Sequence, residues 1–244
     1  MADPLKYQKP ALLDRNQHRR TRVRPGAGFA FARNTNSLYV AGVEFNEAAK
    51  EYAIVFTRSG TGGQPVPVLL LGMRDGENLF VGQDDRWDGR YVPAFVRRYP
   101  FVLMQAPQEK LAVCIDEGCA GVNESEGDAL FDGEGQETPY LKKTLEFLGD
   151  YQREYARTEA FCKRLDEAGL LTEMNARADL KNGNSYAVNG MLIVDEKKLL
   201  ALPDATVLSL FRSGEMHLIS IHLSSLTNMQ RLVDRMAQRH APGR

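Results

Sequence analysis

The chain has 244 residues, with 31 Lys and Arg against 32 Asp and Glu, and a formal net charge of -1 at pH 7. This balance excludes a globally basic nucleic-acid binder, because such proteins need an excess of cations to neutralise phosphates. Hydrophobic residues make up 43% and charged residues 26%, as in an ordinary globular protein with a sizeable core. No apolar run reaches the roughly 20 residues of a membrane-spanning helix, so membrane insertion is not expected.

The chain has three cysteines, Cys114, Cys119 and Cys162, and no two of them form a C-x-x-C pair. An odd number without paired spacing predicts reduced thiols rather than a disulfide framework. The first 20 residues also lack the apolar stretch of a secretory signal peptide. Both observations predict a cytoplasmic protein.

Residues 1–25 form a predicted basic arm, in which seven Lys and Arg residues stand against Asp3 and Asp14. Two interpretations remain open for such a segment. It is either a solvated arm wrapped over the body of the protein or a basic arm that binds an acidic partner.

Residues 26–116 are expected to be rich in strands, because apolar and β-branched runs alternate with turn residues. The short spacings between these runs suit antiparallel pairing. A short helix is expected at 46–52, a turn at the glycine cluster 59–63, and a helical turn over Pro93–Arg98. The expected strands cover residues 37–45, 53–57, 65–73, 78–82, 101–106 and 111–116.

Residues 117–137 form a predicted acidic loop and the expected boundary between two lobes, since the whole stretch 111–141 has no Lys or Arg. Asp128, Asp132 and Glu134 invite a calcium hypothesis, but the alternating ligand pattern of a calcium loop is not met. A solvated loop and the docking of a basic segment are the alternatives. The opposite charges of arm and loop predict that they dock, within one chain or between two chains of a homodimer.

Residues 138–244 are expected to be richer in helices. Thr138 and Pro139 are a favourable start for a long helix whose apolar stripe runs to Leu165. A strand at 186–194, short helices at 195–202 and 205–214, a strand at 215–223 and a final helix capped by Ser225 are expected to follow. The predicted fold class is therefore α+β, with a mostly antiparallel, strand-rich N-terminal part packed on a more helical C-terminal part that contains the long helix. One compact unit is expected, with two lobes as the alternative.

The sequence contains no established catalytic or metal-binding motif, so no catalytic residue is assigned and no metal or cofactor is expected. His217 and His222 lie five residues apart in an expected strand, which would direct them to opposite faces. The other two histidines, His18 and His240, are near the ends of the chain.

Aromatic and arginine side chains alternate over residues 75–101, which include the sole tryptophan. Flat apolar faces beside planar guanidinium donors suit a surface that recognises a ligand or partner. Of the adjacent residues Arg97 and Arg98, at most one is expected to be central to this site, and the other is expected to pair with an acid such as Asp85 or Asp88. The alternative is that the aromatic residues are core and the arginines bind nearby aspartates. The predicted ligand or partner site consists of Trp87, Arg90, Tyr91, Arg97, Arg98 and Tyr99.

Several collinear motifs resemble the SapC family of bacterial proteins, over about residues 5–235. The most specific of them is W-x-x-x-YVPAFVRRYPF at 87–101. The others are H-R-R at 18–20, EFNEAAKEYAIVF at 44–56, NLFV at 78–81, FDGEGQET at 131–138, T-x-x-F-C-x-x-L at 158–165 and HLSSL at 222–226.

This resemblance implies an accessory or binding role rather than a defined reaction. The family takes its name from a surface-layer gene region, and its members tend to be encoded near TonB-dependent receptors, flavin-type tryptophan halogenases and cupin-like oxygenases. The expected function is a binding protein that acts with an uptake system or a peptide- or protein-modifying enzyme, with a protein or peptide partner. The alternative is an enzyme that acts on a peptide or small molecule through dispersed carboxylates, tyrosine and histidine.

Overall fold

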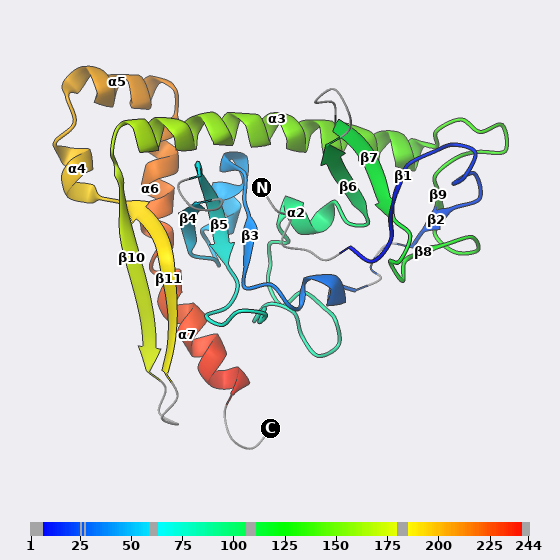
Figure 1. Cartoon of the computed structure of the whole chain (residues 1–244), viewed down its shortest axis with the longest axis horizontal. Coiled ribbons are helices and arrows are strands. Elements are labelled where there is room, and N and C mark those ends of the chain that lie inside the picture. Colours follow the sequence, from blue (N-terminus) through cyan, green and yellow to red (C-terminus); the bar gives the residue numbers. More distant parts are fainter. Residues whose placement is uncertain are drawn as a thin grey trace.

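The computed structural model describes residues 7–24, 26, 28–58, 63–105, 111–179 and 185–240, and it has the α+β architecture that the sequence predicts. A long helix lies along antiparallel sheets (Figure 1). The strands are β1 Pro10–Leu12, β2 Arg22–Val23, β3 Ser37–Tyr39, β4 Ile54–Arg58, β5 Pro65–Leu70, β6 Phe101–Gln105, β7 Leu111–Asp116, β8 Val122–Asn123, β9 Asp128–Ala129, β10 Leu171–Asp179 and β11 Ser185–Val194. The helices are η1 Ala30–Ala32, η2 Gly42–Glu44, α1 Phe45–Ala48, α2 Ala94–Arg97, α3 Pro139–Glu167, α4 Glu196–Leu200, α5 Asp204–Arg212, α6 Glu215–Ser225 and α7 Asn228–Arg239.

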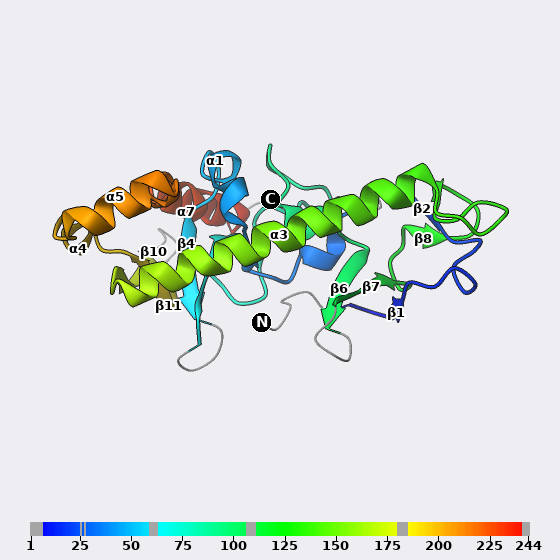
Figure 2. The same cartoon turned by 90° about the horizontal axis from the view of Figure 1, so that it is seen from above.

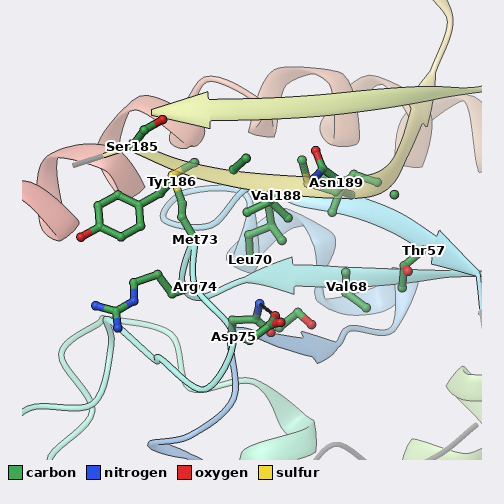
Figure 3. A pocket seen from close by; sticks show the side chains of 16 residues that line it. Thr57, Val68, Leu70, Met73, Arg74, Asp75, Ser185, Tyr186, Val188 and Asn189 are labelled. Carbon is green, nitrogen blue, oxygen red and sulfur yellow. Dashed lines mark hydrogen bonds between the residues drawn. The ribbon is translucent and has the colours of Figure 1, made fainter. Parts of the chain in front are cut away.

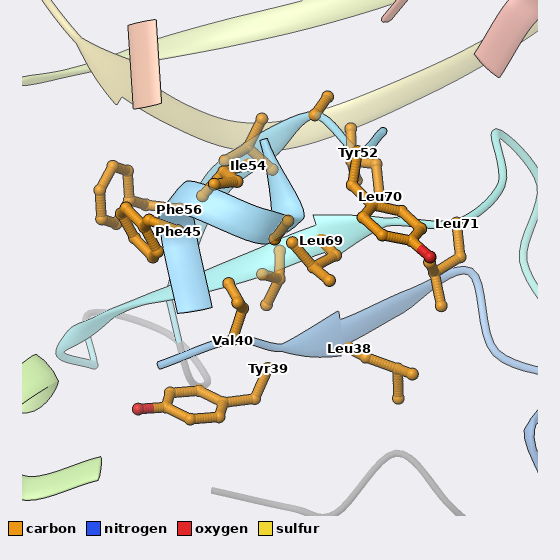
Figure 4. Packing of buried hydrophobic residues seen from close by; sticks show 14 of the residues in the cluster. Leu38, Tyr39, Val40, Phe45, Tyr52, Ile54, Phe56, Leu69, Leu70 and Leu71 are labelled. Atoms are coloured by element: carbon orange, nitrogen blue, oxygen red, sulfur yellow. The ribbon is translucent and has the colours of Figure 1, made fainter. Parts of the chain in front are cut away.

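The largest sheet has the strand order β10-β11-β4-β5-β3 and forms the centre of the main core. Strand β5 is buried along its whole length, which explains its continuous apolar sequence. Side chains from β3, β4, β5 and α1 meet in the core, as Figure 4 shows for Leu38, Phe45, Ile54 and Leu69. Burial of this apolar surface is the main force that holds the sheet and its covering helices together.

Helix α3 begins where the sequence predicts, because Thr138 caps it and Pro139 occupies its first turn. The Thr138 hydroxyl accepts a hydrogen bond from the Leu141 amide at 3.3 Å. The helix continues through Gly149 and crosses the whole molecule, as both views show (Figures 1 and 2). Its first half contributes Leu148 to a small apolar cluster, and its second half contributes Phe161 to the main core.

The N-terminal arm is paired with the acidic loop of the same chain. Strand β2 lies between β8 and β9, and β1 pairs with β7, all antiparallel. The predicted docking of the arm on the loop thus occurs within one chain. It involves main-chain hydrogen bonds between paired strands as well as ion pairs. Those ion pairs join Lys9 to Glu117, Arg20 to Glu124 and Arg24 to Glu126.

The strand expected at 215–223 is wrong, because this segment is helix α6. Its buried residues, Ile219, His222 and Ser225, recur every three residues on one helical face, and α6 packs against β4, β11, α1 and α5. An apolar run that is covered on several sides has no clear strand or helix period, so neighbouring elements decide its conformation. His217 and His222 therefore lie on a helix and not on the two faces of a strand.

Other expectations about single elements also need correction. Residues 78–82 form no strand and contribute only an isolated bridge between Val81 and Trp87. Residues 171–179, a largely polar segment for which the sequence predicted no strand, form strand β10. Ser225 does not cap the last helix, since its hydroxyl accepts a hydrogen bond from the Ile54 amide at 3.0 Å. Most of the turn expected at 59–63 lies outside the described residues.

Candidate functional site

Three of the six predicted site residues, Trp87, Arg90 and Tyr91, line one cavity of about 900 Å³. The other walls come from the end of α1 and from α7, which lies about 140 residues further along the chain. We call this the aromatic–arginine cavity. Its lining residues are Glu47, Lys50, Glu51, Trp87, Asp88, Gly89, Arg90, Tyr91, Arg231 and Arg235.

The Trp87 indole is held in place by polar and aromatic contacts. Its Nε1–H donates to the Tyr52 hydroxyl at 2.9 Å, and that hydroxyl donates to the Tyr91 carbonyl oxygen at 2.5 Å. The indole also stacks on Phe80 at a centroid distance of 6.3 Å and meets the edge of Phe29 at 5.7 Å. A partly buried indole fixed in this way offers a rigid apolar face at small entropic cost to binding.

The buried carboxylate of Glu44 positions Tyr91. Its Oε1 accepts from the Tyr91 hydroxyl at 2.6 Å and from the Ala94 amide at 2.7 Å, and its Oε2 accepts from the Ala41 amide at 3.0 Å. Burial, followed by the nearby Glu44, raises the pKa of Tyr91 above its usual range. The phenol therefore stays protonated at neutral pH and acts as a donor to Glu44.

Four cations border the cavity, and they differ in their partners. Lys50 binds Glu47 at 2.6 Å, and Arg235 binds Asp88 at 2.7 Å while its guanidinium lies 4.3 Å from the Phe80 ring centroid.

The other two cations are arginines without a carboxylate partner among the described residues. The Arg231 guanidinium donates to the Lys50 carbonyl oxygen at 3.0 Å, and the Arg90 side chain is exposed and forms no ion pair there. The Arg90 main chain is fixed, because its amide donates to both oxygens of Glu51. Guanidinium groups beside an indole suit a ligand with an anionic group next to an apolar one.

Arg97 lies on the surface beside this cavity rather than in its lining. Its Nε donates to the Val92 carbonyl oxygen at 3.0 Å, and its guanidinium lies 5.9 Å from the centroid of the Tyr91 ring and 5.3 Å from that of Phe147. The side chain is exposed and covers aromatic surface.

Arg98 is buried and Tyr99 is partly buried, and both contact the N-terminal arm or its neighbours. Arg98 is 5% exposed, lies 4.2 Å from the Phe95 ring centroid and donates to the Tyr7 hydroxyl at 2.8 Å. Tyr99 stacks on Phe31 at 3.8 Å and donates to Asp116 at 3.0 Å. These contacts fix the N-terminal arm.

The carboxylates expected to pair with Arg97 or Arg98 bind other arginines instead. Asp85 forms an ion pair with Arg33, and Asp88 forms one with Arg235.

A second cavity, of about 610 Å³, lies between the β10–β11 hairpin and the sheet face formed by β3, β4 and β5 (Figure 3). Strand β11 pairs with β4 only at Leu192 opposite Phe56, and Gly190, with φ of +74°, precedes this contact. The hairpin therefore departs from β4. Val188 and Leu70 face each other across the cavity, and Arg74 lies 5.7 Å from the Tyr186 ring centroid.

Sequence reasoning missed this second cavity because its walls come from four separate segments without a shared motif. It also missed Arg231 and Arg235, whose spacing of four indicates only that they share one helical face. Among the described residues, no three His, Cys, Asp or Glu side chains gather as metal ligands do. The Asp132 carboxylate of the acidic loop accepts hydrogen bonds from the amides of Glu134 and Gln136.

Comparisons with known proteins give one match. No curated protein and no solved structure matches the chain. The family model described as SapC matches residues 13–232, which include the aromatic–arginine cavity up to Arg231. This chain belongs to the SapC family.

Proposed function

We propose that this SapC-family protein is an accessory binding protein whose aromatic–arginine cavity captures a peptide or protein segment through a carboxylate. One observation carries the proposal: the fixed Trp87 indole stands in the same cavity as Arg90 and Arg231, which have no carboxylate partner among the described residues. An indole face and a guanidinium fork together favour an aromatic or aliphatic residue next to an acidic group.

The proposed partner is an uptake system of the TonB-dependent type or a peptide- or protein-modifying enzyme, such as a halogenase or a cupin-like oxygenase. The family resemblance suggests these classes, and the cavity supports a peptide ligand. The proposed location is the cytoplasm, which the three free, buried thiols of Cys114, Cys119 and Cys162 support. The described part of the chain contains no helix that is long and apolar enough to cross a membrane.

The test uses Trp87 as a built-in probe, because it is the sole tryptophan of the chain. A short peptide that ends in an aromatic residue with a free carboxylate is titrated against its C-terminal amide, and tryptophan emission is recorded. We expect the acid to change the emission and the amide to bind far more weakly. Arg90→Ala is expected to weaken binding by about 1.5–3 kcal/mol, the scale of a charged hydrogen bond. Arg86→Ala, a change at another exposed arginine of the same loop, serves as the matched control.

A capture experiment from cells that express the chain tests the partner. Wild type, Trp87→Ala and Arg86→Ala are used as bait, and bound proteins are identified by mass spectrometry. The proposal expects a partner that Trp87→Ala loses and Arg86→Ala keeps. Equal capture by all three baits, or turnover of a metabolite by the purified chain without any partner, would contradict it.

A further inference from the structure

Four of the eight exposed large hydrophobic side chains in the described part of the chain lie close together in sequence, on α4 and α5. Leu200 is 86% exposed at the end of α4, and Val207, Leu208 and Phe211 on α5 are 36%, 47% and 71% exposed. Both views place these helices at one end of the molecule, near the C-terminal end of α3 (Figures 1 and 2). Exposed apolar side chains grouped in this way mark an interaction surface.

The apolar side chains of α5 point away from the body of the protein. Leu210 is buried, and the Ser209 hydroxyl accepts a hydrogen bond from Arg164 of α3 at 3.0 Å. With about 100° between successive residues, Val207, Phe211 and Leu208 lie roughly 60°, 100° and 160° from Leu210, on the side opposite Ser209. This apolar arc therefore faces away from α3.

The charges that flank the arc are arranged symmetrically about Leu208. Asp204 and Arg212 are the first and last residues of α5, each four positions from Leu208, so the three form one stripe along the helix. Neither charge forms an ion pair within the described residues. A stripe that is acidic at one end, apolar in the middle and basic at the other is complementary to a reversed copy of itself.

We propose that α5 is the contact surface for a second copy of this chain. Two α5 helices would pack antiparallel about a two-fold axis near Leu208. Such an isologous contact places Asp204 opposite Arg212 of the partner subunit twice, with Phe211 and Leu208 between these pairs. Because α5 has only nine residues, with α4 beside it, the contact is smaller than a standard interface, and the dimer is weak and reversible.

The test is a complementation experiment by sedimentation velocity over a dilution series of the full chain. Wild type is expected to shift from monomer to dimer as concentration rises. Asp204→Arg and Arg212→Asp are each expected to stay monomeric, because each places like charges opposite each other. An equimolar mixture of the two variants is expected to restore the dimer, since every contact then joins opposite charges. Mixing cannot repair a folding defect, so this result separates the interface from any effect on α5 stability.

Two further variants make the outcome decisive. Phe211→Ser is expected to weaken the dimer at least tenfold, whereas Glu146→Arg, an exposed charge reversal on α3, is expected to leave it unchanged. A wild type that stays monomeric throughout would overturn the proposal, and its binding to lipid vesicles through Phe211 would assign this face to a membrane surface instead. A dimer that survives in both charge variants, or a mixture that stays monomeric, would also overturn it.

Discussion

The buried His222 side chain joins β4 to β11 where the two strands form no main-chain hydrogen bonds with each other. Strands β4 and β11 pair at one position, and the buried imidazole continues the connection beyond it. Its Nε2 accepts from the Val194 amide at 3.1 Å, so the proton is on Nδ1, which donates to the Ile54 carbonyl oxygen at 2.9 Å. Burial lowers the pKa of His222 to about 4. Protonation would leave the Val194 amide without its acceptor.

This arrangement predicts loss of stability in mild acid. The folded-state pKa lies below the ordinary value of 6.5, so the unfolded chain takes up a proton first as the pH falls. The contribution of His222 is complete above about pH 6.5 and declines toward about pH 4, by about 3 kcal/mol in all, at about 1.4 kcal/mol per pH unit. Urea unfolding across this range measures the slope. His222→Gln keeps a donor and an acceptor and should show a shallower slope; an unchanged slope would rule out His222 as its source.

Glu44 gives a second prediction at the residue scale. Three donors converge on its carboxylate, so both oxygens must act as acceptors. Glu44→Gln would turn an amide NH₂ group toward one of these donors, and we expect a loss of about 1–3 kcal/mol of unfolding free energy. Chemical denaturation is the measurement. Glu47→Gln, an exposed acid in α1, should change stability by less than about 0.5 kcal/mol, and an equal effect of both substitutions would contradict the assigned role of Glu44.

At the element scale, Asp116 is the anchor of the N-terminal arm. This fully buried carboxylate accepts from the amides of Gln8, Lys9 and Gly118 and from the Tyr99 hydroxyl. The ion pairs of the arm are exposed and are screened by salt, whereas these hydrogen bonds and the strand pairs are not. The arm is thus held chiefly by main-chain contacts, not by the charge attraction that composition suggests.

We therefore expect the arm to stay protected from hydrogen exchange in about 0.5 M salt, where the Debye length is roughly 4 Å. Asp116→Ala leaves buried donors without an acceptor and should release the arm and destabilise the fold by about 3 kcal/mol or more. Glu117→Gln weakens the contacts of this carboxylate to Lys9, Gln17 and His18 but leaves those of Asp116 in place, so it serves as the control. Faster exchange of residues 8–12 in wild type at high salt would show that ion pairs hold the arm.

At the scale of the whole molecule, α3 joins two apolar clusters. Leu141 and Leu148 belong to the smaller cluster with Phe101 and Leu130, whereas Phe161 and Leu165 belong to the main core. The acidic loop lies between the strands of the first half and α3, and its strands β8 and β9 are paired with β2. Cutting this loop should leave both halves attached through the packing of α3.

A glutamate-specific protease tests this expectation, since residues 111–141 lack Lys and Arg but contain exposed Glu124 and Glu126. We expect the cleaved chain to elute as one species in gel filtration and to separate only in denaturant. Elution of two separate folded fragments under native conditions would show independent domains.

The sequence determined the features that depend on neighbours along the chain. Thr138 and Pro139 mark the start of α3, and the apolar stripe that follows predicts its length. Continuous apolar runs predict β4 and β5. These signals are readable because helix capping and hydrophobic periodicity depend only on residues close together in the chain. That Trp87, Arg90 and Tyr91 lie close together was predictable for the same reason, since the three stand within five residues of the chain.

Tertiary structure decided what depends on partners far along the chain. Segment 215–223 becomes helix α6 because its buried face fits against β4 and β11, and the polar segment 171–179 becomes a strand because β11 pairs with it. Arg98 and Tyr99 lie outside the cavity because they bind Tyr7 and Asp116, while Arg231 lines the cavity with Trp87 from α7. Burial and long-range hydrogen bonding are set by the assembled fold, so a local pattern that is compatible with two conformations is resolved only there.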